Sequence, residues 1–127
     1  MKALSEKQGL SAVVLDGLDK CHIETTDTLP QAMRLEWIGE VLQNYEQRYA
    51  AYNKAIGKLS GWYNQHGFKM MLLKGYGLSL NWPNPKHRPC GAIDIWLFDR
   101  YKDADSCIAS DKGIIIDNSH HHHTVFE

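Results

Sequence analysis

The sequence of 127 residues predicts an α+β fold, with N-terminal helices packed on a small mixed β-sheet. Three observations support this prediction. Apolar or aromatic residues recur in alternating steps of four and three between Ile38 and Tyr63, which is typical of a long helix. A short apolar segment, 68–73, is bounded by glycines, as buried strands often are. Side chains alternate in character along 91–98, which indicates a second strand.

Helices are expected over the first half of the chain. Residues 4–20 place apolar side chains near one stripe, although Gly9 and Gly17 weaken the pattern. A second helix is expected to start near Thr28, because Thr28-Leu-Pro-Gln31 fits a capping box with proline in the first turn. Gly67 fits the residue that follows the end of the long helix.

The regular spacing defines a helical seam of eight residues: Ile38, Leu42, Tyr45, Tyr49, Tyr52, Ile56, Leu59 and Tyr63. Two interpretations stay open at this point. The seam is either a core-facing stripe in a helical layer or the contact surface of a homodimer. Tyrosines pack poorly in a two-stranded coiled coil, so the core-facing interpretation is favoured.

The second half is expected to hold the sheet, with strands at 68–74, 91–98, 113–117 and 122–126. Short helices are expected around 76–82 and 101–110, the first stopped by Pro83 and Pro85. We therefore predict a helical region at 1–66 and a β/α region at 67–127, within one compact domain or fragment whose sheet is incomplete.

Composition excludes several classes of function. A net charge of −1 and the lack of a basic stripe do not fit non-specific binding of nucleic acid. Three widely spaced cysteines argue against a disulfide framework and for a reducing compartment. No apolar run approaches the roughly 20 residues of a membrane span, so we expect a cytoplasmic protein without a membrane partner.

The chemistry-bearing residues occur in one ordered block. It runs from a strand through Leu73-Lys-Gly75, a short helix and a proline-bearing loop to Arg88, then to Gly91 and the strand with Asp94. This order resembles the uncharacterised bacterial nucleotidyltransferase family, which is related to the polymerase-beta-like nucleotidyltransferases. The resemblance spans nearly the whole chain and covers the N-terminal part of a longer family member.

The resemblance implies a role for each matching residue. Lys74, Gly75 and Arg88 match nucleotide-binding positions, and Asp94 matches the second acid of an Asp-x-Asp pair, a catalytic residue and metal ligand. Ala92 stands where the first acid is expected. A third acid on a later strand has no clear counterpart before Glu127.

The missing acid affects catalysis more than binding. Two acids at alternate strand positions would lie about 6.6 Å apart at Cα and could hold two Mg²⁺ ions between them. One carboxylate can still hold one Mg²⁺ with help from a triphosphate. We therefore expect a nucleoside triphosphate as partner, an unknown acceptor, Mg²⁺ bound weakly or not at all, and impaired transfer.

Each residue also has a simpler interpretation. Asp94 could form a structural ion pair with Arg88 or Lys74, and those two cations could be solvated loop charges. Trp96 and Phe98 could pack or stack on a base, and Cys90 is expected to be an ordinary buried thiol.

Two other functions remain open. The tyrosines of the seam, Tyr49 and Tyr52 among them, could form the surface of a non-catalytic interaction module. His120–His123 could bind zinc, although alternate histidines of a strand form separate pairs, fewer than the usual three or four ligands.

Overall fold

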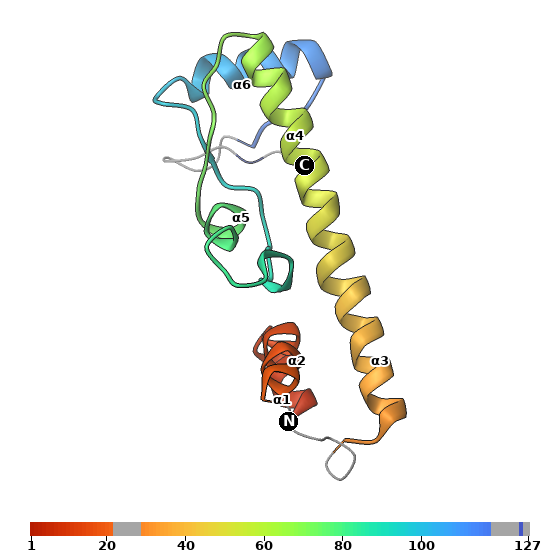
Figure 1. Cartoon of the computed structure of the whole chain (residues 1–127). Helices are drawn as coiled ribbons and strands as arrows, with labels where there is room; N and C mark the ends of the chain where they lie inside the picture. The colour runs from red at the N-terminus through yellow and green to blue at the C-terminus, as the bar shows by residue number, and fades with distance from the viewer. Residues whose placement is uncertain (22–28, 118–124, 126–127) are drawn as a thin grey trace. The chain divides into compact units, whose positions relative to one another are not determined.

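A computed structural model of the chain describes residues 1–21, 29–117 and 125, and it has the expected α+β composition (Figure 1). The described residues are mostly helical, with one two-stranded antiparallel sheet. They divide into two compact units. The first unit is Met1–Ile56 with Leu73–Asp94, and the second is Gly57–Leu72 with Ile95–Glu127.

Three helices of the first unit come from the N-terminal region. They are α1 (Lys2–Lys7), α2 (Ser11–Lys20) and α3 (Gln31–Val41). The helix expected at 4–20 is divided between α1 and α2 because Gly9 has φ +66°, a left-handed conformation that suits glycine. Thr28 of the expected capping box lies outside the described residues, and α3 begins directly after Pro30.

A small core holds α2 and α3 together. Ala12 and Leu15 of α2 pack with Trp37 and Val41 of α3. The Trp37 indole is fully buried, and its Nε1–H donates to Ser11 Oγ at 2.6 Å, which satisfies the polar atom that burial would otherwise leave unpaired.

The long helix predicted from the seam is confirmed. After α3, a π-helical turn, η1 (Leu42–Glu46), leads directly into α4 (Gln47–Gln65). The residues of the seam lie in different environments along the helix. Tyr45 packs against the first core, Ile38 and Leu42 are exposed, and Tyr63 is fully buried in the core of the second unit.

The second unit contains the sheet. Strand β1 (Met71–Leu72) pairs with β2 (Ile95–Trp96), so that Met71 lies opposite Trp96 and Leu72 opposite Ile95. Helix α6 (Tyr101–Lys112) follows. The core of this unit consists of Tyr63, Phe68, Leu97 and Ala104.

The strands are shorter than the sequence predicts. The expected strands 68–74 and 91–98 pair only through two residues each, and their pairing is antiparallel. In the expected strands 113–117 and 122–126, the described residues contribute one bridge, between Asp117 and Val125. His120–His123 lie outside the described residues, as does Glu127.

The boundary between a helical region and a β/α region at residue 66 stays a prediction. Helix α4 ends at Gln65, and Gly67 with φ +74° follows it, as expected of a residue after a helix C-terminus. None of the helices in the described residues combines the length and the apolar character that a membrane span requires.

Tyr63 provides a test of the second core. Its hydroxyl is buried and has no hydrogen-bond partner among the described residues, and burial, with the charge of Asp105, raises its pKa to about 12. We expect Tyr63→Phe to raise the free energy of unfolding by about 1 kcal/mol, because an unsatisfied buried hydroxyl is costly. Urea denaturation at neutral pH measures this change.

The same variant has a predicted effect at alkaline pH. The raised pKa makes a contribution to stability that is complete below the ordinary pKa of 10 and is lost as the pH rises through about 12. Tyr63→Phe should therefore lose less stability between these values than the wild type. Tyr101→Phe, at a half-buried position of the same unit, is the control, and equal losses in all three proteins would contradict the prediction.

Candidate functional site

The candidate site forms where two backbone segments of the first unit approach closely. The Leu73 N–H donates to the carbonyl oxygen of Asp94 at 2.9 Å. At Gly75, a Cβ atom would lie 3.3 Å from the Ala92 carbonyl oxygen, which is tighter than ordinary contact. Glycine at position 75 therefore lets the two segments lie against each other.

Lys74 and Asp94 meet at this approach. Lys74 Nζ lies 3.6 Å from Asp94 Oδ1, and the two side chains are 75% and 38% exposed. Such an exposed ion pair contributes only about 0–1 kcal/mol to stability. Breaking this ion pair therefore costs little free energy, and both side chains are able to contact a ligand in place of each other.

Lys74 also has an unusual backbone. It is the first residue of α5 (Lys74–Ser79) and has φ +33°, which is uncommon for a residue with a side chain. Strained backbone of this kind is concentrated at functional sites.

Arg88 lies against the same turn. Its Nη1 donates to the Gly75 carbonyl oxygen at 2.7 Å, and its guanidinium lies 5.8 Å from the centre of the Trp82 ring. Among the described residues, the ion pair of Asp94 is with Lys74 and not with Arg88. Lys74, Gly75, Arg88 and Asp94, which the sequence singled out, are thus connected within one unit.

Ala92 provides no polar side chain to this arrangement. It is exposed and lies in irregular backbone, because β2 begins only at Ile95. The strand face that we expected Ala92 and Asp94 to share is therefore not part of the observed sheet. Further along, the predicted alternation is present: Trp96 and Phe98 stack with ring centres 4.3 Å apart and are partly exposed, whereas Leu97 is buried.

The loop that carries Arg88 is held by a buried histidine that sequence reasoning missed. In the 3-10 turn η2 (Pro85–His87), His87 Nδ1 lies 2.8 Å from Asp16 Oδ2 and Nε2 lies 2.9 Å from Glu46 Oε1. Lys86 Nζ also contacts Glu46, at 3.0 Å. Hydrogen bonds from His87 and Lys86 lower the pKa of Glu46. The contacts join residues 71 and 41 positions apart, so no sequence motif marks them.

Two tyrosines of the seam hold the other parts of the site. The Tyr49 ring stacks on Tyr76 at 4.7 Å, and its hydroxyl shares a hydrogen bond of 2.9 Å with Ser79 Oγ. The Tyr52 hydroxyl donates to the Gly91 carbonyl oxygen at 3.0 Å. The seam thereby supports α5 and the segment that precedes Asp94.

Asp94 is the residue at this turn whose carboxylate could ligate a metal ion. The described residues contain no group of three or more His, Cys, Asp or Glu side chains that could hold a metal ion. Mg²⁺, however, is commonly bound by one or two carboxylates together with substrate phosphates. Asp94, partly exposed beside a lysine, fits that mode of binding.

Comparison with protein-family models gives a match that covers nearly the whole chain. A family model described as "Uncharacterised nucleotidyltransferase" matches residues 2–127. No curated protein and no solved structure matches the chain significantly.

The contacts that hold the Arg88 loop predict that the free energy of unfolding falls at acid pH. Because the pKa of Glu46 is lowered from 4.5 in the folded state, its contribution to stability is present above pH 4.5 and is lost as the pH falls through the folded pKa. We expect Glu46→Gln to be less stable than wild type at pH 6 and to lose less stability on acidification. Chemical denaturation across this range measures both effects.

Glu36→Gln is a suitable control, since the Glu36 side chain is 66% exposed and lies 3.9 Å from Lys2, its partner in an ion pair. An acid profile of Glu46→Gln that matches those of Glu36→Gln and wild type would show that the contacts to His87 and Lys86 do not stabilise the fold.

Proposed function

Because the chain belongs to the family of uncharacterised nucleotidyltransferases, we propose that it binds a nucleoside triphosphate with Mg²⁺ at the Leu73–Gly75 turn and Asp94. The reaction of such a site is the Mg²⁺-dependent transfer of a nucleotidyl group to an acceptor, here unknown. The observation that supports the proposal most directly is the 3.6 Å separation of Lys74 Nζ and Asp94 Oδ1 beside a turn that Arg88 contacts.

The cations have separate roles in this proposal. Lys74 is mostly exposed, so its ammonium group can turn from Asp94 to a phosphate oxygen. Arg88 is fixed to the Gly75 carbonyl through Nη1, which leaves its other N–H groups to pair with a second phosphate oxygen. Phosphate binding would thus free the Asp94 carboxylate to coordinate the metal.

In this proposal, the chain retains nucleotide binding to a greater extent than it retains nucleotidyl transfer. In nucleotidyl transfer, an acceptor oxygen attacks the α-phosphorus and pyrophosphate leaves. A pair of bound metal ions would stabilise the attacking and leaving oxygens. Asp94 supplies one carboxylate, and Ala92 supplies none. We therefore infer that the second metal position is poorly held and that transfer by this chain is impaired.

The alternative is a non-catalytic interaction module that uses the tyrosines of the seam. Tyr49 and Tyr52 are engaged within the chain, with Tyr76, Ser79 and the Gly91 carbonyl. These contacts support the proposal that the two tyrosines hold parts of the first unit together.

The first test is a calorimetric titration of ATP with Mg²⁺ into wild type and Asp94→Asn. We expect the variant to lose about tenfold or more of the Mg²⁺-dependent affinity, because it cannot coordinate the metal through a charged carboxylate. Asp103→Asn is the matched control, since Asp103 is 68% exposed and lies 3.6 Å from Arg100. Equal or negligible binding by wild type and Asp94→Asn would remove the site.

The second test restores the missing acid. We expect Ala92→Asp to tighten Mg²⁺ binding in the presence of ATP by about tenfold or more and to raise the release of pyrophosphate, because a second carboxylate completes the pair. Ala92→Asn has nearly the same shape without the charge and should do neither. If the Asp and Asn variants bind Mg²⁺ equally, position 92 has no part in metal binding.

A further inference from the structure

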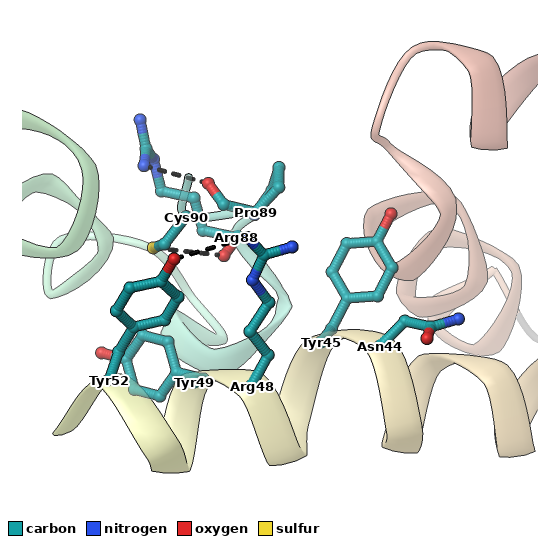
Figure 2. A pocket seen from close by; sticks show the side chains of 8 residues that line it. All are labelled: Asn44, Tyr45, Arg48, Tyr49, Tyr52, Arg88, Pro89 and Cys90. Carbon is teal, nitrogen blue, oxygen red and sulfur yellow. Dashed lines mark hydrogen bonds between the residues drawn. The ribbon is translucent and has the colours of Figure 1, made fainter. Parts of the chain in front are cut away.

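A cavity of about 200 Å³ lies in the first unit (Figure 2). One side is formed by residues of η1 and the start of α4, and the other by the segment Arg88–Cys90. The helical residues that line it are Asn44, Tyr45, Arg48, Tyr49 and Tyr52. Neither the sequence nor the family match assigns a role to this cavity.

The charge in the cavity comes from Arg48. Figure 2 shows its guanidinium rising from the helix between Tyr45 and the pair Tyr49 and Tyr52. Arg48 contacts Tyr52, with Nη2 3.4 Å from the hydroxyl and Cζ 5.7 Å from the ring centre. No carboxylate within the described part of the chain forms an ion pair with Arg48. Arg48 is exposed, so its guanidinium group is open to a ligand that enters the cavity.

Arg88 contributes to the cavity in a different way. Its guanidinium is directed away from the helix in Figure 2 and binds the Gly75 carbonyl oxygen. The segment Arg88–Cys90 thus lines the cavity, and the guanidinium group of its arginine contacts the proposed nucleotide-binding turn. The two sites are neighbours on a single segment, which Tyr52 fixes through Gly91.

The lining and the size define the chemistry of the ligand. Guanidinium groups bind phosphate and carboxylate oxygens in a bidentate manner, and tyrosines offer ring faces and hydroxyl groups. Pockets for drug-sized ligands measure roughly 300–1,000 Å³. A cavity of about 200 Å³ has room for an oxyanion with one adjoining ring.

We propose that this cavity binds the oxyanionic end of the acceptor, a phosphate or carboxylate group paired with Arg48 and flanked by tyrosine rings. The anion site follows from the cavity itself, whereas its assignment to the acceptor rests on the proposed function. Acceptor and nucleotide would then approach each other from opposite sides of the segment that leads to Asp94.

The test uses phenyl phosphate and benzoate as probes, without Mg²⁺ or nucleotide, followed by NMR shifts of backbone amides and of the Arg48 Nε–H. We expect at least one probe to bind and to shift Arg48, Tyr45 and Cys90. Arg48→Ala should weaken binding by about tenfold or more, because it removes the guanidinium group that lies in the cavity beside Tyr52. The probe that binds with the higher affinity identifies the preferred oxyanion.

Lys54→Ala is the matched control for charge, because Lys54 is exposed on α4 and does not line the cavity. Lys54→Ala should bind the probes as wild type does. Equal binding by Arg48→Ala and wild type, or no binding of either probe at about 10 mM, where even weak sites fill, would overturn the anion site.

A second titration, with saturating ATP and Mg²⁺, separates the two proposals. Simultaneous binding of probe and nucleotide supports the acceptor assignment, and displacement of the probe by ATP overturns it. If the probes bind at Arg48 but ATP with Mg²⁺ does not bind at all, the proposed nucleotide function fails while the anion site stands.

Discussion

The close approach of Leu73–Gly75 to Ala92–Asp94 is the constraint on which the site depends. A main-chain hydrogen bond from Leu73 to Asp94 fixes the distance, and the lack of a side chain on Gly75 allows the Ala92 carbonyl to come near. Lys74 follows Leu73 directly, so the same contact brings its ammonium group to the Asp94 carboxylate. The chemistry of the site is thus a consequence of backbone geometry.

Around this approach, the surroundings are firmly anchored and the charged groups are exposed. Tyr49, Tyr52 and His87 hold the flanking segments through a ring stack and hydrogen bonds of 2.8–3.0 Å. Lys74 and Asp94, in contrast, form an exposed pair that contributes little to folding. A ligand that separates the pair would therefore cost the fold little stability and would contact both charged groups.

Sequence reasoning succeeded where a local pattern has a single physical meaning. The spacing of the seam predicts the long helix, and Gly67 predicts its end, as observed. The roles predicted for Lys74 and Asp94 stay predictions, and the structure places the two side chains together. The observed strands are shorter than predicted, because a pattern of apolar residues indicates which side chains are buried but not how many residues pair with a neighbouring strand.

The anchors could not be predicted in the same way. His87 meets Asp16 and Glu46 only through the folding of distant segments, and none of the three stands in a recognisable motif. The spacing of the seam does not predict the hydroxyl contacts of its tyrosines with Ser79 and Gly91, because these contacts depend on the positions of loops. The cavity at Arg48 arises from the same long-range arrangement.

Replacement of Mg²⁺ by paramagnetic Mn²⁺ in complex with ATP tests the central claim most directly, because relaxation enhancement decays steeply with distance from the metal. In spectra of the whole chain, the account predicts the strongest broadening at the amides of Lys74, Gly75 and Asp94, and much weaker broadening in Asp94→Asn. Broadening centred elsewhere, or equal in both proteins, would contradict a nucleotide-bound metal at this backbone approach.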